Sequence, residues 1–372
     1  MTSPWVTSVP LGVFWCGYLY MPPVLYLYIT HMHHSPIKYC QPYLMASTGL
    51  CCTVYCLATP LIHILGSTWP SPLFIMCGYV VPIYACTSYV LSAAAMVVMF
   101  KITDLVVNHS HFTPRHVNQL AFYRWLLYPK VQLPSMGCIG FVSTLPCLVA
   151  VVISADLTTL EMQQSSYNSI LWISMAAVAI LGSVVGIGLS KHMPPYMDNL
   201  GLRRTYQRTY RTSIVFVLVS LLHGGLEWIL SVPLGREFHV RNLIYTLAMQ
   251  YVFFFNIAAP LRHLALSSQA MTSVVTTTSK AASRMKELEQ YLRSNHGLPT
   301  FMTFCQRDFR TEELRAWQLV EQFKQRLVSA RKLLTTCLVP QCALACPTSV
   351  KWGPTYVTRL ESWLRRDEDI VG

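Results

Sequence analysis

Charged side chains are scarce in this sequence. Asp, Glu, Lys and Arg together make up 12% of its 372 residues, whereas a soluble domain carries about 25%. At the same time 53% of the residues are hydrophobic, and the mean hydropathy is +0.40. So few charges cannot cover the surface of a soluble globular protein of this length. The composition therefore predicts a membrane protein, with the lipid bilayer as its first partner.

Acidic residues are the scarcer charge, with 16 Asp and Glu against 28 Lys and Arg and a net charge of +12. An excess of positive charge is also typical of nucleic-acid-binding proteins. Here, however, the basic residues lie in short segments between apolar runs and in the C-terminal tail. This distribution is typical of the cytoplasmic side of a membrane protein, so no nucleic-acid partner is predicted.

Motifs for catalysis, metals and disulfides are missing. Most of the 13 cysteines lie inside apolar runs, where cysteine behaves as a small hydrophobic residue and indicates no disulfide framework. The histidines at 31, 33 and 34 have no cysteine or carboxylate at ligand spacing, so they indicate a solvated loop. The spacing of Cys337, Cys342 and Cys346 matches no zinc pattern. With no nucleotide loop, Ser–His–Asp arrangement or paired carboxylates, we predict no enzyme, no cofactor and no metal.

Long apolar runs are what the sequence has in abundance. A membrane-spanning helix needs about 20 apolar residues, and each such run must be helical because lipid cannot pair an open backbone. The sequence predicts an all-α fold with a seven-helix transmembrane bundle. The seven predicted spans are Val9–Ile29, Leu44–Leu65, Pro72–Phe100, Ser135–Ala155, Ser169–Ser190, Thr212–Val232 and Val240–Ala259.

The loop charges predict an orientation. Basic residues accumulate in cytoplasmic loops, and an outside N-terminus places most of them there. The predicted inner loops hold Lys38, Lys101, Arg115, Arg124, Lys130, Lys191, Arg203, Arg204, Arg208 and Arg211, against Arg236 and Arg241 outside. We therefore expect a multi-pass protein of the plasma membrane with its N-terminus outside and its C-terminal tail in the cytoplasm.

The chain divides into four predicted parts. Residues 1–263 form the seven-transmembrane domain, 264–284 a linker rich in Ser and Thr, 285–339 a small helical domain, and 340–372 an irregular tail rich in Pro and Cys with a short helix. Within the tail, helical periodicity covers Ser279–Leu292 and resumes over Thr311–Leu334.

Two ionisable residues lie within the sixth predicted span. Glu227 is in the middle of the run and His223 is one helical turn before it. A carboxylate inside a membrane is energetically costly and normally faces the bundle interior or water. These residues are candidates for a ligand or proton site in the outer half of the membrane, which an extracellular ligand would reach. The alternative is a hydrogen-bonded pair that only fixes helix packing.

Apolar residues of the tail recur at helical spacing. They predict the core of a small helical bundle on the cytoplasmic side. The predicted core residues are Leu288, Leu292, Phe301, Phe304, Leu314, Trp317, Val320 and Phe323.

The order and spacing of the tail residues resemble the first half of the regulator of G-protein signalling (RGS) domain. The shared pattern is a Leu-x3-Leu helix followed by Gly297, Phe301-x2-Phe304, an acidic Asp308, Glu312-Glu313-Leu314-x2-Trp317 and Glu321-x-Phe323-Lys324. Seven spans followed by such a module are similar to the receptor-like RGS proteins of plants, which have relatives in fungi and protists.

The resemblance implies a function. The tail is expected to bind the switch regions of a Gα subunit and to accelerate its GTP hydrolysis by holding the catalytic residues of Gα in place. The family's contact positions correspond to Phe309, Glu312 and Glu313. The family commonly has Asn where this chain has Glu313, and Phe where it has Ala316. The likeness fades after Gln325, so the module corresponds to part of an RGS domain.

Two other classes of function remain open. One is a seven-transmembrane receptor or sensor whose tail serves only as an interaction module. The other is a transporter, in which Glu227 and His223 would line a path across the membrane. No inverted repeat or pair of broken helices supports the transporter.

Overall fold

The fold is helical throughout the part of the chain that the structure describes. This computed structural model describes residues 4–33, 37–65, 69–108, 114–164, 166–193, 202–230, 240–262, 278–294, 296–307 and 311–338, with Leu344 and Thr358. Over these ranges the only β pairing is a single bridge between Pro70 and Thr158. The predicted all-α class is confirmed for the described residues.

Among the described residues, five helices are long and apolar enough to cross a membrane. Each has at least 21 residues, so the chain is a multi-pass membrane protein. They match five of the seven predicted spans. The five are Pro42–Ile62, Ser71–Val107, Pro129–Ile153, Tyr167–Lys191 and Asn242–Arg262. They correspond to α3 (Pro42–Leu65), α4 (Ser71–Ile75) with η2 (Met76–Val80) and α5 (Val81–Asn108), α7 (Pro129–Ile153), α9 (Ser166–Lys191), and α12 (Val240–Phe253) with η4 (Phe254–Ala258).

The first predicted span, Val9–Ile29, is two helices instead of one. Helix α1 (Pro4–Tyr18) has 15 residues and α2 (Met21–Thr30) has 10, so neither alone reaches the length of a span. Proline occupies the first turn of α2. Because Pro22 and Pro23 have no N–H to donate to the preceding turn, the helix cannot continue through them, although both fit a helix start.

The sixth predicted span lies in α10 (Leu202–Leu230), which has 29 residues. It begins ten residues before the predicted start at Thr212 and is not among the five candidate spans. Its early turns carry Arg203, Arg204, Arg208 and Arg211. These charges lower the hydropathy of the described part of the helix.

Contacts within the chain define two units that differ from the predicted domains. Unit 1 comprises Met1–Val97, Pro129–Met193 and Leu200–Ser273, and unit 2 comprises Val98–Tyr128, Pro194–Asn199 and Val274–Gly372. The predicted boundary at residue 263 left 98–128 in the membrane domain, whereas their contacts group them with the tail. Most of the predicted linker 264–284 and nearly all of 340–372 lie outside the described residues.

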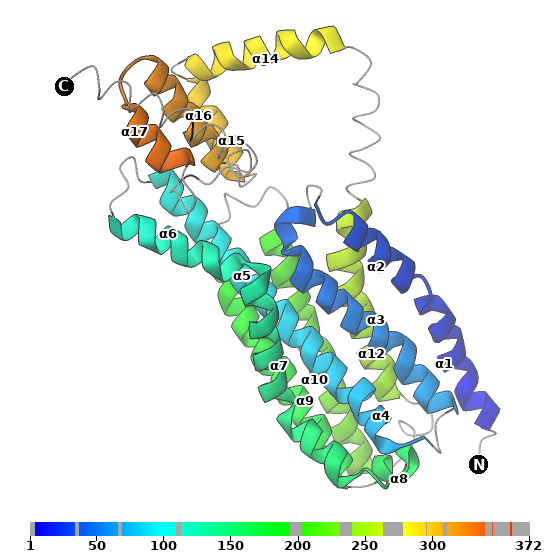
Figure 1. Ribbon diagram of the computed structural model, residues 1–372. Coiled ribbons are helices and arrows are strands. Elements are labelled where there is room, and N and C mark those ends of the chain that lie inside the picture. Colours follow the sequence, from blue (N-terminus) through cyan, green and yellow to red (C-terminus); the bar gives the residue numbers. More distant parts are fainter. Residues whose placement is uncertain are drawn as a thin grey trace. The chain divides into compact units, whose positions relative to one another are not determined.

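Unit 1 is a bundle of helices (Figure 1). Glycines allow close contacts between some of them. Helix α3 contacts α1, α2, α7 and α12, and α10 contacts α9 and α12. On α9, a Cβ placed on Gly186 would lie 2.1 Å from Cζ of Tyr210. On α7, a Cβ on Gly140 would lie 2.5 Å from the ring of Tyr84. Small residues at these crossings let aromatic rings pack directly against helix backbones.

The core of unit 2 combines a loop between two spans with the tail. The loop contributes the last turns of α5 and all of α6 (Pro114–Leu127), and the tail contributes α16 (Thr311–Lys324), α17 (Ala330–Leu333) and η5 (Leu334–Leu338). Leu120 of α6 and Val106 of α5 are completely buried, and Leu333 of α17 packs with them at 6% exposure. Partly buried Leu319, Val320 and Phe323 pack on this cluster from α16.

The tail helices follow the predicted order with one break. Helix α14 (Thr278–Arg293), α15 (Gly297–Arg307) and α16 are consecutive. The helix predicted over Thr311–Leu334 ends at Lys324 instead, because Arg326 has φ 59°, a left-handed conformation that terminates a helix. At the corner between α14 and α15, a Cβ on Gly297 would lie 1.9 Å from the carbonyl oxygen of Tyr291, so the turn requires glycine.

Candidate functional sites in the two units

A buried polar network lies inside unit 1. Its members are Tyr89 and Ser92 of α5, Tyr206, Thr209 and Tyr210 of α10, and Asn256 of η4. None of them is more than 5% exposed. The three tyrosine rings pack together, with the centroid of Tyr89 5.2 Å from that of Tyr206 and 5.0 Å from that of Tyr210.

Asn256 is the central hydrogen-bonding residue of this network. Its Oδ1 accepts a hydrogen bond from the Tyr89 hydroxyl at 3.0 Å, and its Nδ2 donates to Thr209 Oγ1 at 3.4 Å. Nδ2 also donates to the Val252 carbonyl at 2.8 Å. Asn256 lies in a π-helical turn, a distortion that is frequent at functional sites. One amide side chain therefore links three helices of the bundle.

Further bonds tie α10 to α5. The Tyr210 hydroxyl donates to the Tyr89 carbonyl at 3.2 Å, and the hydroxyls of Ser92 and Tyr206 lie 2.6 Å apart. Hydrogen bonds between membrane helices contribute about 0.6 kcal/mol each on average. The network as a whole fixes one relative position of α5, α10 and η4. Any other position would require all of these hydrogen bonds to break and re-form together.

A small cavity of 90 Å³ adjoins the network. Tyr89 and Tyr210 line it together with Cys86 of α5, Met175 of α9 and Tyr245 of α12, and none of its lining residues is charged. A cavity of roughly 150 Å³ holds a benzene molecule. The space therefore suits a neutral, mostly apolar group of a few heavy atoms that can bond a tyrosine hydroxyl.

Replacing the network amide should destabilise unit 1. Asn256→Leu removes the acceptor of the buried Tyr89 hydroxyl, which costs about 2 kcal/mol, whereas Tyr89→Phe removes the donor to the Asn256 side-chain oxygen and costs about 1 kcal/mol. The double variant should be more stable than the sum of the two changes, because neither partner is then left unpaired. Thermal unfolding in detergent measures all three. Strict additivity would contradict a direct Tyr89–Asn256 bond.

The sequence-predicted site in this unit was the pair His223 and Glu227. Both lie on α10 and His223 is half-buried, but the side chain of Glu227 is outside the described residues. Sequence reasoning considered ionisable residues within spans and passed over neutral ones. An amide in the last apolar run, and tyrosines four residues apart at 206 and 210, are the signals from which the polar network was predictable.

In unit 2, the described contact positions of the RGS-like pattern are Glu312 and Glu313, since Phe309 lies outside the described residues. Glu312 forms an ion pair with Arg124 of α6, with Nη2 2.8 Å from Oε1 and both side chains about four-fifths buried. Burial raises the pKa of Glu312 and Arg124 acts in the opposite direction. Glu313 is exposed.

A second arginine connects the tail to the loop. Arg315 Nη2 donates to the Val107 carbonyl in the last turn of α5 at 2.8 Å, and Nη1 donates to Gln318 Oε1 at 3.1 Å. An arginine at a helix C-terminus satisfies carbonyls that have no partner within the helix. Burial lowers the pKa of Arg315. Helix α16 thus meets both loop segments through charged groups as well as apolar ones.

The predicted tail core is only partly correct. Phe301 and Trp317 pack around buried Leu292, Cys305 and Leu314, and Phe323 packs on the core of unit 2. Two predicted core residues are exposed instead: Leu288 by 38% and Phe304 by 50%. Leu288 lies a full turn before Leu292, and α14 extends beyond the helices that cover its C-terminal turns (Figure 1). Phe304 is half exposed on α15, beside the ring of Phe301, whereas the neighbouring Cys305 is buried.

Within the described residues, no three His, Cys, Asp or Glu side chains are grouped to hold a metal ion. Comparison of the chain with protein-family models, curated proteins and solved structures gave no match.

Proposed function

We propose that the chain is a seven-span regulator of heterotrimeric G-protein signalling. Its spans anchor it, and the helices of unit 2 bind a Gα subunit and accelerate GTP hydrolysis. The proposal rests on the likeness of 288–324 to an RGS domain. It is supported by the way the helices of that stretch pack, with Leu292, Cys305 and Leu314 buried together and Trp317 against them.

The proposed topology adds two spans to the five candidates. Helices α1 and α2 would cross as one interrupted span, and α10 would cross with its arginines at the inner surface. The positive charges of the loops then favour an outside N-terminus and a cytoplasmic unit 2 in the plasma membrane.

Two features bear on how unit 2 would meet Gα. Glu313 is exposed on the first turn of α16 and available to a partner. Glu312 is paired with Arg124, so a partner that used Glu312 would have to open this ion pair. A carboxylate at 313 cannot donate the hydrogen bonds of the family's common asparagine, so we expect weak activity in the natural chain.

GTP hydrolysis tests the proposal. The full chain in lipid nanodiscs should accelerate single-turnover hydrolysis by at least one class of Gα subunit. Glu313→Asn should raise the rate further, because an amide can donate to the groups around the catalytic glutamine of Gα. Glu287→Asn, an exposed acidic residue on α14, is the matched control and should leave the rate unchanged. No acceleration with either the natural chain or Glu313→Asn would refute the proposal.

A receptor or sensor is the second candidate function. The observation that favours it is the uncharged cavity beside the Tyr89–Asn256 network, where a bound group would alter bonds between three helices. If this function is correct, binding of a ligand in the cavity would change the conformation of unit 1 even in a chain whose unit 2 has no effect on GTP hydrolysis by Gα.

A further inference from the structure

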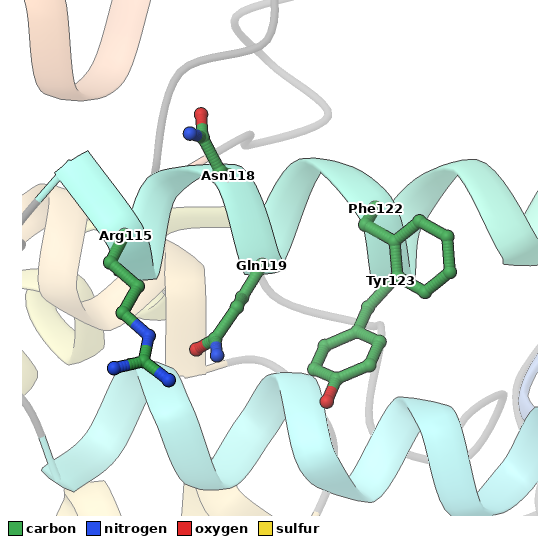
Figure 2. A pocket seen from close by; sticks show the side chains of 5 residues that line it. All are labelled: Arg115, Asn118, Gln119, Phe122 and Tyr123. Carbon is green, nitrogen blue, oxygen red and sulfur yellow. The ribbon is translucent and has the colours of Figure 1, made fainter.

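All strongly exposed residues of α6 lie along one stripe. Arg115 and Asn118 begin it, and Phe122, Trp125 and, just after the helix, Tyr128 continue it. The spacing of three and four residues puts their backbone positions on one broad face of the helix, although the side chains of Arg115 and Asn118 diverge (Figure 2). The other side, which includes Leu120, packs into the core of unit 2. Helix α6 is therefore covered on one face and open on the other.

The open face is unusually aromatic. Phe122 is 55% exposed, Trp125 51% and Tyr128 59%. The rings of Phe122 and Trp125 stack, with centroids 6.1 Å apart and an interplanar angle of 24°. Three adjacent aromatic side chains form a larger apolar surface than the scattered exposed residues of an ordinary soluble face.

A hollow lies at the other end of the stripe. Arg115, Asn118, Gln119, Phe122 and Tyr123 line an open depression of about 590 Å³. Figure 2 shows Arg115, Gln119 and Tyr123 on one side of the helix and Asn118 projecting from another. On the Arg115 side, the depression offers a guanidinium and the Gln119 amide next to the Tyr123 ring. This chemistry suits a phosphate-bearing headgroup with an apolar neighbour.

The chain itself brings α6 to a membrane surface. One candidate span ends at Val107, seven residues before α6 begins, and the next begins at Pro129, two residues after α6 ends. Consecutive spans emerge on the same side of a bilayer. Because Ser71–Val107 has 37 residues, more than the about 20 needed to cross, its last turns extend beyond that face. The start of the next span at Pro129 therefore tethers the C-terminal end of α6 to the membrane surface. A helix of 14 residues is about 21 Å long. It has no acidic residue between Pro114 and Lys130, which favours anionic lipid.

We propose that α6 is an interfacial helix, whose stripe Phe122–Trp125–Tyr128 enters the headgroup layer of the inner leaflet and whose Arg115 binds the phosphate of an anionic phospholipid. Aromatic side chains concentrate at this depth of a bilayer because one end is apolar and the other polar. The site goes beyond G-protein regulation and does not depend on it.

Photo-crosslinking in the full chain tests the site. The changes Phe122→p-benzoylphenylalanine and Trp125→p-benzoylphenylalanine should each give lipid adducts by mass spectrometry in nanodiscs of phosphatidylcholine and phosphatidylserine. The same change at Tyr291, 45% exposed on α14, is the control and should give several-fold fewer. Equal adducts at all three positions, or adducts to a second copy of the chain in place of lipid, would overturn the proposal.

The headgroup preference provides an independent readout. Adducts at Phe122 should be enriched in phosphatidylserine relative to its share of the nanodisc, and Arg115→Ser should remove the enrichment while the adducts themselves remain. Unchanged enrichment in Arg115→Ser would show that Arg115 does not bind the headgroup, and would overturn that part of the site.

Discussion

The Gly186→Ala variant is expected to unfold at a temperature well below the unfolding temperature of the natural protein. The added Cβ would lie 2.1 Å from Tyr210 Cζ, and the ring cannot retreat because Tyr210 is 2% exposed and packs against Tyr89. Overpacking of this kind costs about 1–3 kcal/mol. Displacement of Tyr210 also breaks its bond to the Tyr89 carbonyl, which adds about 1 kcal/mol. Thermal unfolding in detergent measures the loss.

The same helix supplies the matched control. Gly188 is two residues away, and a Cβ there would have no atom within 4 Å. Because alanine is favoured over glycine in a helix by up to about 1 kcal/mol, Gly188→Ala should be as stable as the natural chain or more so. Tyr210→Leu should partly rescue Gly186→Ala, since a smaller side chain leaves room for the Cβ. Equal midpoints for the Gly186 and Gly188 variants would contradict this packing.

Arg124→Ala is expected to open the contact between α6 and α16. Removing one member of a buried ion pair costs about 3–5 kcal/mol, and the lower end applies here because the side chains retain about a fifth of their exposure. Opening by about 3 kcal/mol corresponds to roughly hundredfold faster amide exchange. Deuterium exchange of α6 and α16, with the full chain in nanodiscs, measures it.

Acidic pH should reduce the opening of the α6–α16 contact in the Arg124→Ala variant. Burial already raises the pKa of Glu312, so the folded state binds this proton more readily than the unfolded state. A group with a raised pKa favours folding below its pKa and opposes it as the pH rises through that value. The Glu312 carboxylate that has lost the Arg124 charge is therefore most destabilising at neutral pH, and protonation at lower pH reduces this effect.

Two further variants separate the ion pair from a general loss of structure. Arg124→Ala combined with Glu312→Gln should recover most of the protection, because no buried charge is left unpaired. Arg293→Ala removes an arginine that pairs with Glu289 and Glu321 but is 55% exposed at its side chain. Exposed pairs contribute less than about 1 kcal/mol, so exchange should change little. Equal effects of Arg124→Ala and Arg293→Ala would contradict the assignment.

The membrane helices were largely predictable because length and hydropathy alone select them. The runs at α3, α5, α7, α9 and α12 were found in this way. The break at Pro22 and Pro23 was missed although both prolines are visible, since an average over the apolar run hides a backbone that lacks two N–H donors. The left-handed Arg326 was missed because its conformation follows from tertiary packing and not from its residue type.

The candidate sites were harder to predict because they depend on residues far apart in sequence. Nothing near Glu312 in the chain indicates that Arg124 is its partner, and nothing near Tyr89 indicates Asn256. Helical periodicity identified Trp317 and Phe323 as apolar positions, but it could not tell which of Leu288 and Leu292 another helix would cover. Such pairings arise only once the spans have brought the loop and the tail into one unit.

The contact between α6 and α16 also sets an order of events during biosynthesis. Arg124 and Glu312 are separated by 188 residues, and a ribosome adds about 5–20 residues per second. For roughly 10–40 s after it leaves the ribosome, α6 therefore has no α16 to cover Leu120 and its neighbours. Translation of the later spans occupies this interval. Unit 2 is completed last. A chain that stops before Thr311 therefore leaves the Leu120 side of α6 uncovered and accessible to chaperones and to quality control.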